Sequence, residues 1–386
     1  MKSALLKFNA WFHLWIGIVT GLIVFIVSIT GCILVFESDI RDWLYPERMA
    51  EAPAPGAQQL PPSILIPAAE AVMPGYHVHG IQYHIPGKAA EITFHSDSVV
   101  YVNPYTGKVN GIREKIDFFS YMETGHVTLW LPKKVGTKIV LYGTLIFFFL
   151  LLTGLVLWWP KKWNRHNIKN AFNIKWKAKF KRVNYDLHNV LGFYTLPVTI
   201  IMAFTGIYMG LGWVQKPFYW LTSGGKSMPA YYEAPSDTAA ANPLPILKVA
   251  DEVWRRSVNE LSHPKSAAVL IGIPDDEDEK TAAIYCYTNM EGAFYTGHYF
   301  DQYTGEKLQA SGVDAVPFQD AHFGDQFRRM NYSLHTGLIL GLPTKIIYFI
   351  GSLIAASLPI TGFYIWWGKK KKQKKKPAKR PQQAAA

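Results

Sequence analysis

The sequence has few cysteines, two among 386 residues. Cys32 lies inside a long apolar stretch and Cys286 in a mixed polar region, so neither a disulfide framework nor a cysteine-rich metal site is available. The absence of a Cys-x-x-Cys-His motif excludes covalent attachment of a c-type haem, and an iron–sulfur cluster bound by this chain's thiolates is excluded as well. Any haem in this protein must be bound non-covalently.

Motifs for nucleotide cofactors and for acid–base catalysis are also missing. No Gly-x-Gly-x-x-Gly motif follows an expected strand, so the chain gives no sign of a flavin or nicotinamide site. We find no convincing proton-transfer pair or activated nucleophile, and we therefore expect no catalytic side chain. If the chemistry is redox chemistry, the electron donor is a separate molecule.

Long apolar blocks are what the sequence has in abundance, with 49% hydrophobic and 15% aromatic residues. Four of these blocks reach the roughly 20 residues that cross a bilayer as a helix. The expected spans lie within 1–36, 136–160, 188–211 and 335–368, the last with a preceding interfacial segment. The predicted fold class is an α-helical membrane protein with an internally duplicated four-helix transmembrane bundle.

One stretch of the first span allows a different interpretation. Ile29-Thr30-Gly31-Cys32 resembles a lipoprotein cleavage site after a basic start and an apolar run. The next four residues continue the apolar span instead of becoming polar, which favours an intact helix.

Basic residues indicate how the chain is oriented. Lys and Arg total 40 against 28 Asp and Glu, and half of the basic residues fall in the start of the chain, the loop 161–187 and the tail 369–386. Basic loops face the cytoplasm, so both termini are expected there, in the bacterial inner membrane. Topology and attraction to anionic membrane lipid explain the net charge of +12, and no nucleic-acid partner is needed.

Two long segments, 37–135 and 212–334, are each large enough for a small α+β domain in the periplasm. Each begins with a helical pattern, near 64–72 and 246–258, and continues with strand patterns. The expected strands are 91–94 and 99–102 in the first segment and 267–273, 282–287 and 294–300 in the second. We expect each segment to fold independently. Each also contains a Tyr-Thr-Gly turn at the same distance after a strand, at 105–107 and 303–305, which indicates duplication.

Histidines are placed in a matching way in the two halves of the chain. His13 and His188 each stand at the beginning of a span and 17 residues before a Thr-Gly pair. His126 and His335 each precede a span that ends in Thr-Gly, three further residues and Trp-Trp. Ionisable residues are costly in hydrocarbon, so their repetition indicates function.

These four histidines predict two bis-histidine metal sites. With the N-terminus inside, His13 and His188 approach one another at the cytoplasmic face, and His126 and His335 at the outer face. Each pair offers two neutral imidazoles to a planar iron cofactor, which favours electron transfer over oxygen binding. The alternative is that they are interfacial histidines bonded to backbone or lipid. His298 and His322 are possible substitutes in the outer pair.

Two further groups of residues are weaker candidates. Arg328 and Arg329 lie near the outer pair, where they are candidates for contact with haem propionates or an anionic substrate. Basic side chains that extend along the ends of spans are the alternative for this region. His77 and His79, with His84 and His95 nearby in sequence, are candidates for metal chelation, although exposed strand or loop histidines are the simpler interpretation.

Several motifs resemble the PepSY-associated transmembrane family over nearly the whole chain. They are Trp11-Phe12-His13-Leu14-Trp15-Ile16-Gly17, Asp186-Leu187-His188-Asn189-Val190-Leu191-Gly192, Leu334-His335-Thr336-Gly337, both Tyr-Thr-Gly turns and both Trp-Trp span ends. At His126 the chain departs from the family, because the Arg often found just after this histidine is absent.

The resemblance implies two small periplasmic PepSY-like domains, two non-covalent haem b groups ligated by the four histidines, and electron transfer outward to a ferric siderophore. This makes the expected activity that of a haem-dependent ferric-siderophore reductase supplied by an unidentified cytoplasmic or membrane donor. A different periplasmic acceptor, such as a redox protein or cupric ion, is one alternative. A haem-free accessory protein that binds a peptide, protease or transporter is another.

Overall fold

The computed structural model describes residues 2–52, 54, 56–96, 98–261, 268–274, 279–290 and 294–374. The last part of the basic tail and most of the acidic run at 275–279 lie outside this description. The chain forms two compact units. The helical unit comprises Met1–Val35, Met122–Gly210 and Pro343–Ala386, and the sheet unit comprises Phe36–Tyr121 and Leu211–Leu342.

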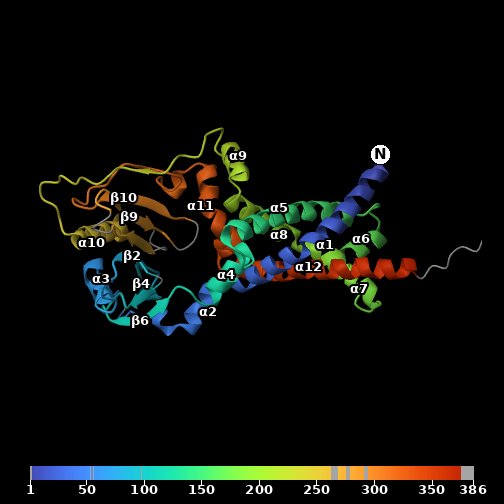
Figure 1. Cartoon of the computed structure of the whole chain (residues 1–386), viewed down its shortest axis with the longest axis horizontal. Helices are drawn as coiled ribbons and strands as arrows, with labels where there is room; N and C mark the ends of the chain where they lie inside the picture. Colours follow the sequence, from blue (N-terminus) through green and yellow to red (C-terminus); the bar gives the residue numbers. More distant parts are fainter. Residues whose placement is uncertain are drawn as a thin grey trace, which may run out of the picture. The chain divides into compact units, whose positions relative to one another are not determined.

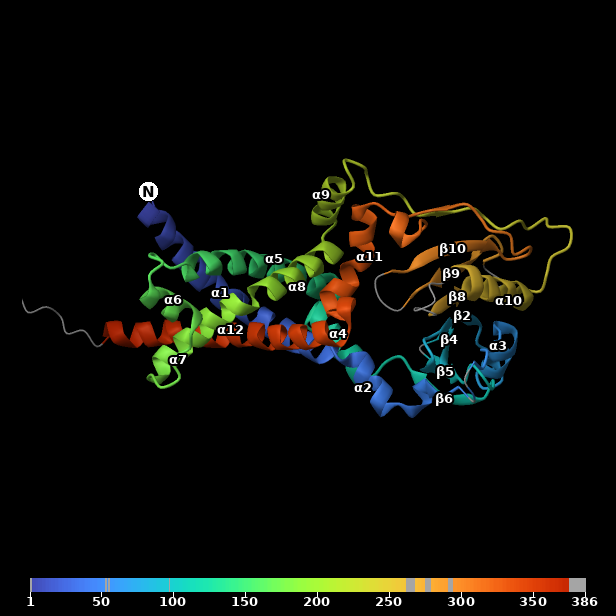
Figure 2. The same cartoon turned by 180° about the vertical axis from the view of Figure 1, so that it is seen from behind.

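Long apolar helices make up most of the helical unit (Figures 1 and 2). They are α1 (Lys2–Leu34), α5 (Lys133–Trp158), a continuous run of α7 (Phe180–Asp186), the π-helical turn η2 (Leu187–Leu191) and α8 (Gly192–Gly210), and α12 (Leu342–Lys374). Within the described residues these four are long and apolar enough to cross a membrane. The predicted helical membrane protein is confirmed, and the short helix α6 (Arg165–Phe172) lies in the loop between the second and third spans.

Small residues let these helices approach closely. A side chain at Gly143 of α5 would collide with Ile23 of α1 at 2.9 Å, and one at Gly351 of α12 would lie 3.1 Å from Val198 of α8. The Ser352 hydroxyl of α12 donates a hydrogen bond to the Ser28 carbonyl of α1 over 2.8 Å. Such packing and hydrogen bonding stabilise helix association where no hydrophobic driving force acts between helices.

Short helices precede the second and fourth spans, as the sequence indicated. α4 (Phe118–Thr128) carries His126 and ends before Leu129 and Trp130, which both have positive φ. α11 (Phe323–Thr336) ends at Gly337, whose φ of 79° is the left-handed conformation that favours glycine. Both histidines therefore lie on helices separate from the spans that follow.

A seven-stranded antiparallel sheet is the centre of the sheet unit, with the order β10-β9-β8-β2-β4-β5-β6. From the first segment come β2 (Val78–Tyr83), β4 (Ala90–Phe94), β5 (Ser98–Val102) and β6 (Val109–Glu114), and from the second β8 (Val269–Gly272), β9 (Ala283–Thr288) and β10 (Thr296–Asp301). β2 pairs with β8. The expectation of two independently folding domains is wrong, because backbone hydrogen bonds join the segments into one sheet.

Smaller elements complete this unit. Two short ladders pair β1 (Met49–Ala50) with β3 (Gly87–Lys88) and β7 (Tyr232–Glu233) with β11 (Ala310–Ser311). The remaining helices are α2 (Glu37–Leu44), η1 (Pro46–Arg48), α9 (Gly212–Thr222), η3 (Ser257–Leu261), η4 (Phe318–Asp320) and η5 (Leu338–Leu340).

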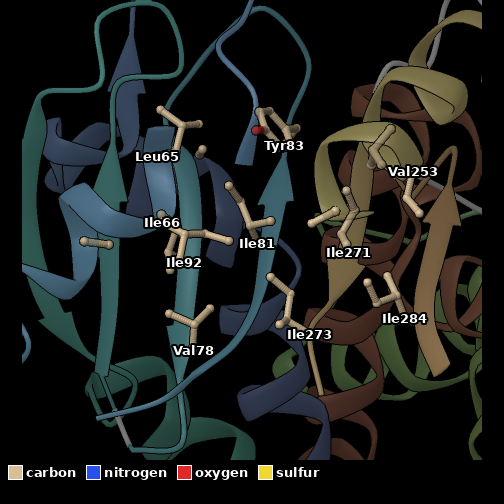
Figure 3. Packing of buried hydrophobic residues seen from close by; sticks show 14 of the residues in the cluster. Leu65, Ile66, Val78, Ile81, Tyr83, Ile92, Val253, Ile271, Ile273 and Ile284 are labelled. Carbon is tan, nitrogen blue, oxygen red and sulfur yellow. The ribbon is translucent and has the colours of Figure 1, made fainter. Parts of the chain in front are cut away.

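The hydrophobic core of the sheet unit is shared by both segments. Helices α3 (Pro62–Glu70) and α10 (Ile246–Arg256) contribute to it, and Asp251 of α10 accepts hydrogen bonds from the backbone and hydroxyl of Ser63 at the start of α3. Figure 3 shows Ile81 and Ile92 of the first segment in one cluster with Ile271 and Ile284 of the second. All four are fully buried.

The two Tyr-Thr-Gly turns have matching hydrogen bonds. The Asn103 side chain accepts from the backbone N–H groups of Tyr105 and Thr106, and the Asp301 side chain accepts from those of Tyr303 and Thr304. In both turns the glycine has a φ of 72°. The repeated sequence thus produces the same local structure in both segments.

The shared core predicts that the two segments unfold together. Ile81→Ala removes a fully buried side chain of β2, which costs about 2–5 kcal/mol of unfolding free energy. Hydrogen–deuterium exchange should then become faster in β8 and β9 as well as in β2. The control, Ile112→Ala, changes a 46% exposed residue of β6 and should cost less than about 0.5 kcal/mol. Faster exchange confined to the first segment would contradict a cooperative sheet.

Candidate functional site

A cavity of about 380 Å³ lies inside the helical unit and contains the inner histidine pair. Its walls come from α1, α5, η2, α8 and α12, with His13 and His188 among the lining residues. Most of the other lining residues are apolar, and Trp158 stacks on Phe193 with ring centroids 3.6 Å apart. The volume lies in the range of about 300–1,000 Å³ that is typical of small-molecule and cofactor sites.

The rings of His13 and His188 face this cavity with their centroids 6.4 Å apart and their planes at 84°. A metal ion bound between two opposed imidazoles, about 2 Å from each nitrogen, keeps the ring centroids roughly 6 Å apart. His13 and His188, the pair expected at the cytoplasmic face, are therefore brought together at a separation that would let both hold one iron ion.

A threonine on a neighbouring helix orients each of these rings. His13 Nδ1 lies 3.0 Å from the Thr153 hydroxyl of α5. His188 Nδ1 lies 2.9 Å from the Thr361 hydroxyl of α12 and 3.1 Å from the Leu358 carbonyl. His188 also stands in the π-helical turn η2, a local widening of the helix that is frequent at functional sites.

These contacts fix which ring nitrogen carries the proton. The Thr153 hydroxyl donates to the Leu150 carbonyl and the Thr361 hydroxyl to the Ser357 carbonyl, each over 3.0 Å. Because these hydroxyl hydrogens are used, each threonine oxygen accepts from Nδ1–H of its histidine. The lone pair is then on Nε2, which is the nitrogen available to a metal.

Two asparagines repeat the arrangement one helical turn before each histidine. The Asn9 side chain donates to the Thr153 carbonyl over 3.1 Å, and the Asn184 side chain donates to the Thr361 carbonyl over 3.0 Å. In each half of the chain one threonine therefore accepts two hydrogen bonds. Its backbone carbonyl accepts from the asparagine and its hydroxyl oxygen accepts from the histidine.

Glycines following the threonines leave room for the imidazoles. A Cβ atom at Gly154 would lie 3.1 Å from His13 Cε1, and one at Gly362 would lie 3.3 Å from His188 Cε1. Both distances are tighter than ordinary contact, so a larger side chain would displace the ring. This close approach explains why glycine follows threonine at these positions.

His126 is bound by the same kind of Thr-Gly pair. Its Nδ1 lies 2.9 Å from the Val27 carbonyl and 3.1 Å from the Thr30 hydroxyl of α1, and its Cε1 would lie 3.0 Å from a Cβ at Gly31. His335 is on the last turn of α11 and belongs to the sheet unit. The pairing of His126 with His335 stays a prediction.

Arg329 has a structural environment that differs from the expected one. Its side chain is only 2% exposed, and its guanidinium donates to the carbonyls of Val313, Tyr295 and Val316 over 2.7, 3.1 and 2.6 Å. These bonds favour a clamp on the 313–316 segment over contact with a propionate or substrate. Arg328 is half-buried, and it stays a candidate for contact with a haem propionate or an anionic substrate.

The substitute histidines also have local partners in the sheet unit. His298 is buried in β10, where desolvation and the nearby Lys307 charge lower its pKa to about 4. His322 stands at the start of α11, with Nε2 3.2 Å from the Asp325 carboxylate and 3.4 Å from the Tyr219 hydroxyl. The fold of the sheet unit accounts for the surroundings of both histidines.

Sequence reasoning found the histidines but missed their partners. The Thr-Gly pairs were used as markers of spacing within one span, whereas Thr153 and Thr361 contact histidines of other helices. The signal for Asn9 and Asn184 was present, because each stands four residues before a matched histidine.

A protein-family comparison agrees with the motifs. The family model described as the PepSY-associated TM region matches residues 10–369. Because this match covers most of the chain, the protein belongs to the PepSY-associated transmembrane family. No curated protein matches the chain significantly.

Arg329 is expected to contribute to stability. Arg329→Met removes the buried guanidinium that donates to three backbone carbonyls, and a hydrogen bond to a charged group is worth about 1.5–3 kcal/mol. Thermal unfolding of the detergent-purified variant should show a loss of at least about 3 kcal/mol. Arg328→Met is the matched control and should cost less than about 1 kcal/mol. Wild-type stability of Arg329→Met would contradict the clamp.

Proposed function

We propose that the protein is a di-haem oxidoreductase of the bacterial inner membrane that passes electrons to a periplasmic ferric siderophore and releases ferrous iron. The observation that carries this proposal is the pair His13 and His188, with ring centroids 6.4 Å apart in an apolar cavity and each Nδ1 hydrogen-bonded to a threonine of a neighbouring helix. Membership of the PepSY-associated transmembrane family supports it.

The residues of the cavity fit a haem held without a covalent bond. His13 and His188 would hold it through one imidazole nitrogen each, and the glycines and apolar side chains around them carry no competing charge. When bound, haem b supplies one-electron redox chemistry at a potential set by its ligands and surroundings. His126 supports a second haem, to which we assign it together with His335.

The protein's own residues hold and shield this site. The threonine hydroxyls keep Nε2 of each histidine unprotonated. Two histidine ligands on one haem iron would favour electron transfer over oxygen binding. The apolar lining excludes water. The spans are surrounded by membrane lipid. We assign the basic loop 161–187, the basic tail and both termini to the cytoplasm, because basic loops face that side.

In the proposed reaction each ferric ion accepts one electron and becomes ferrous, and the ferrous ion binds its chelator more weakly. A separate cytoplasmic or membrane donor supplies the electrons. Arg328 is the candidate for contact with a haem propionate or an anionic chelate, since guanidinium groups form bidentate pairs with carboxylates.

Haem content tests the proposal directly. We expect two haem b per chain from pyridine-haemochrome quantification of protein expressed with ample haem, and a low-spin spectrum that changes on reduction with dithionite. His13→Ala and His188→Ala should each lose the same haem, because one cofactor needs both ligands. The reduced wild type should release ferrous iron from a ferric siderophore, measured with a ferrous chelator.

The outcomes separate the alternatives. A haem-free wild type would overturn the oxidoreductase and favour an accessory protein. A haem-loaded protein that fails to reduce ferric siderophores, but reduces a periplasmic redox protein or cupric ion, would overturn only the acceptor.

The threonine contacts give a finer prediction. Thr361→Val keeps the side-chain shape but removes the hydroxyl that accepts from His188. Loss of such a supporting hydrogen bond should weaken haem affinity about 10-fold in transfer to apomyoglobin. Thr199→Val is the control, because Thr199 is also a span threonine, is buried, and donates only to carbonyls of its own helix, α8. Equal loss of affinity in both variants would argue against an orienting role for Thr361.

A further inference from the structure

Two histidines and a tyrosine meet in the sheet unit, far along the sequence from any of the four proposed haem ligands. His79 lies on β2, His95 follows β4 directly, and Tyr285 lies on β9. The rings of His79 and His95 are 5.0 Å apart between centroids, with their planes at 86°. The Tyr285 hydroxyl lies 3.4 Å from His79 Nε2. Both chain segments therefore contribute to one cluster.

A β-bulge aims His79 at its neighbours. In the pairing of β2 with β4, Val78 is opposite Phe94 and Gly80 is opposite Thr93, so His79 is the extra residue. Bulges bend a strand locally and redirect a side chain, and they are frequent next to functional sites. A regular strand would place His79 in the alternating pattern of β2 instead.

Glycines leave space on the sheet for the ring of Tyr285. Gly272 of β8 is paired with Gly80 on one side and with Tyr285 on the other. A Cβ atom at Gly272 would collide with the Tyr285 ring, so only glycine permits the ring to lie over β8. The ring leans in this way toward His79, whose centroid is 6.5 Å away.

Charged side chains of both signs act on the cluster. Burial and the neighbouring His95 lower the pKa of His79, and Lys115 adds to this effect, whereas Glu279 opposes it. The Lys115 ammonium donates to the Ser96 carbonyl. Glu279 also acts on Tyr285, whose pKa is raised first by burial and then by this carboxylate.

We propose that His79, His95 and Tyr285 bind one divalent transition-metal ion, with Cu²⁺ bound most tightly. Two imidazoles that share a metal in adjacent positions, with bonds of about 2 Å, have ring centroids roughly 5 Å apart, and their ligand atoms lie about 3.0–3.4 Å apart. The observed 5.0 Å and 3.4 Å satisfy both conditions.

The chemistry of the ligands leads to copper. Imidazole and phenolate suit Cu²⁺, which exceeds Zn²⁺ and the other divalent ions of the first row in affinity for such a site. On binding, the metal replaces the hydroxyl hydrogen of Tyr285, and one proton is released. No group of three His, Cys, Asp or Glu side chains among the described residues is arranged for a metal, so the tyrosine is the third ligand that distinguishes this cluster.

The position of the site gives it a structural consequence. His79 and His95 belong to the first segment and Tyr285 to the second, and the site spans the β2–β8 pairing that joins them. A bound ion therefore links the two segments and stabilises the folded sheet unit according to its affinity and concentration.

The test uses the full chain in detergent, stripped of free metal and kept fully oxidised. Calorimetric titration with Cu²⁺ and electron paramagnetic resonance should give one strongly bound ion per chain with hyperfine coupling to two nitrogens. His79→Ala and His95→Ala should each weaken binding at least 10-fold. Tyr285→Phe should keep the nitrogen coupling but lose the visible phenolate-to-copper absorption band.

Two control variants separate this site from others. His166→Ala removes an exposed histidine of α6, and His13→Ala removes one of the proposed haem ligands. Both should bind the outer Cu²⁺ as tightly as the wild type, whether or not the haem proposal holds. Wild-type affinity and spectrum in the His79→Ala/His95→Ala double variant would overturn the proposal, as would the absence of a bound ion in the wild type.

Discussion

The hydrogen bond from histidine Nδ1–H to a threonine of another helix is the interaction on which the helical unit's site depends. Inside an apolar bundle a polar group must find a partner in the protein, because neither water nor lipid provides one. Thr153 and Thr361 have already given their hydrogens to backbone carbonyls of their own helices, so their oxygens are acceptors only. One interaction thereby satisfies a buried donor, fixes the tautomer and ties two helices together.

The glycine after each threonine leaves the space that the imidazole ring needs for this hydrogen bond. It lets the imidazole lie against the partner helix at 3.0–3.3 Å from where a Cβ would be, at Gly31, Gly154 and Gly362 alike. Three histidines thus share one mode of attachment. Asn9 and Asn184 extend the correspondence between the inner two, which is why the matched halves produce a pair of rings that face one cavity.

Features governed by local chemistry could be predicted from the sequence. Apolar run length gave the four spans, and short segments rich in β-branched and aromatic residues gave β4, β5, β8, β9 and β10. Contacts distant in sequence could not be predicted in this way. β2 contains Gly80 and lacks a regular alternation, so neither its bulge nor its pairing with β8 was visible. Arg329 was predicted to contact an anionic ligand because arginine suits one. Its actual partners are three carbonyls that lie 13, 16 and 34 residues away in sequence.

The pairing of β2 with β8 changes how the sheet unit is understood. Two independent domains would each need a core and two protected sheet edges, whereas joining them removes an edge from each and merges the cores around Ile81 and Ile271. The join also brings together residues that neither segment could assemble alone, including His79 with Tyr285 and Ser63 with Asp251. The two segments are thus complementary parts of one unit, and any site at their seam exists only when both are folded.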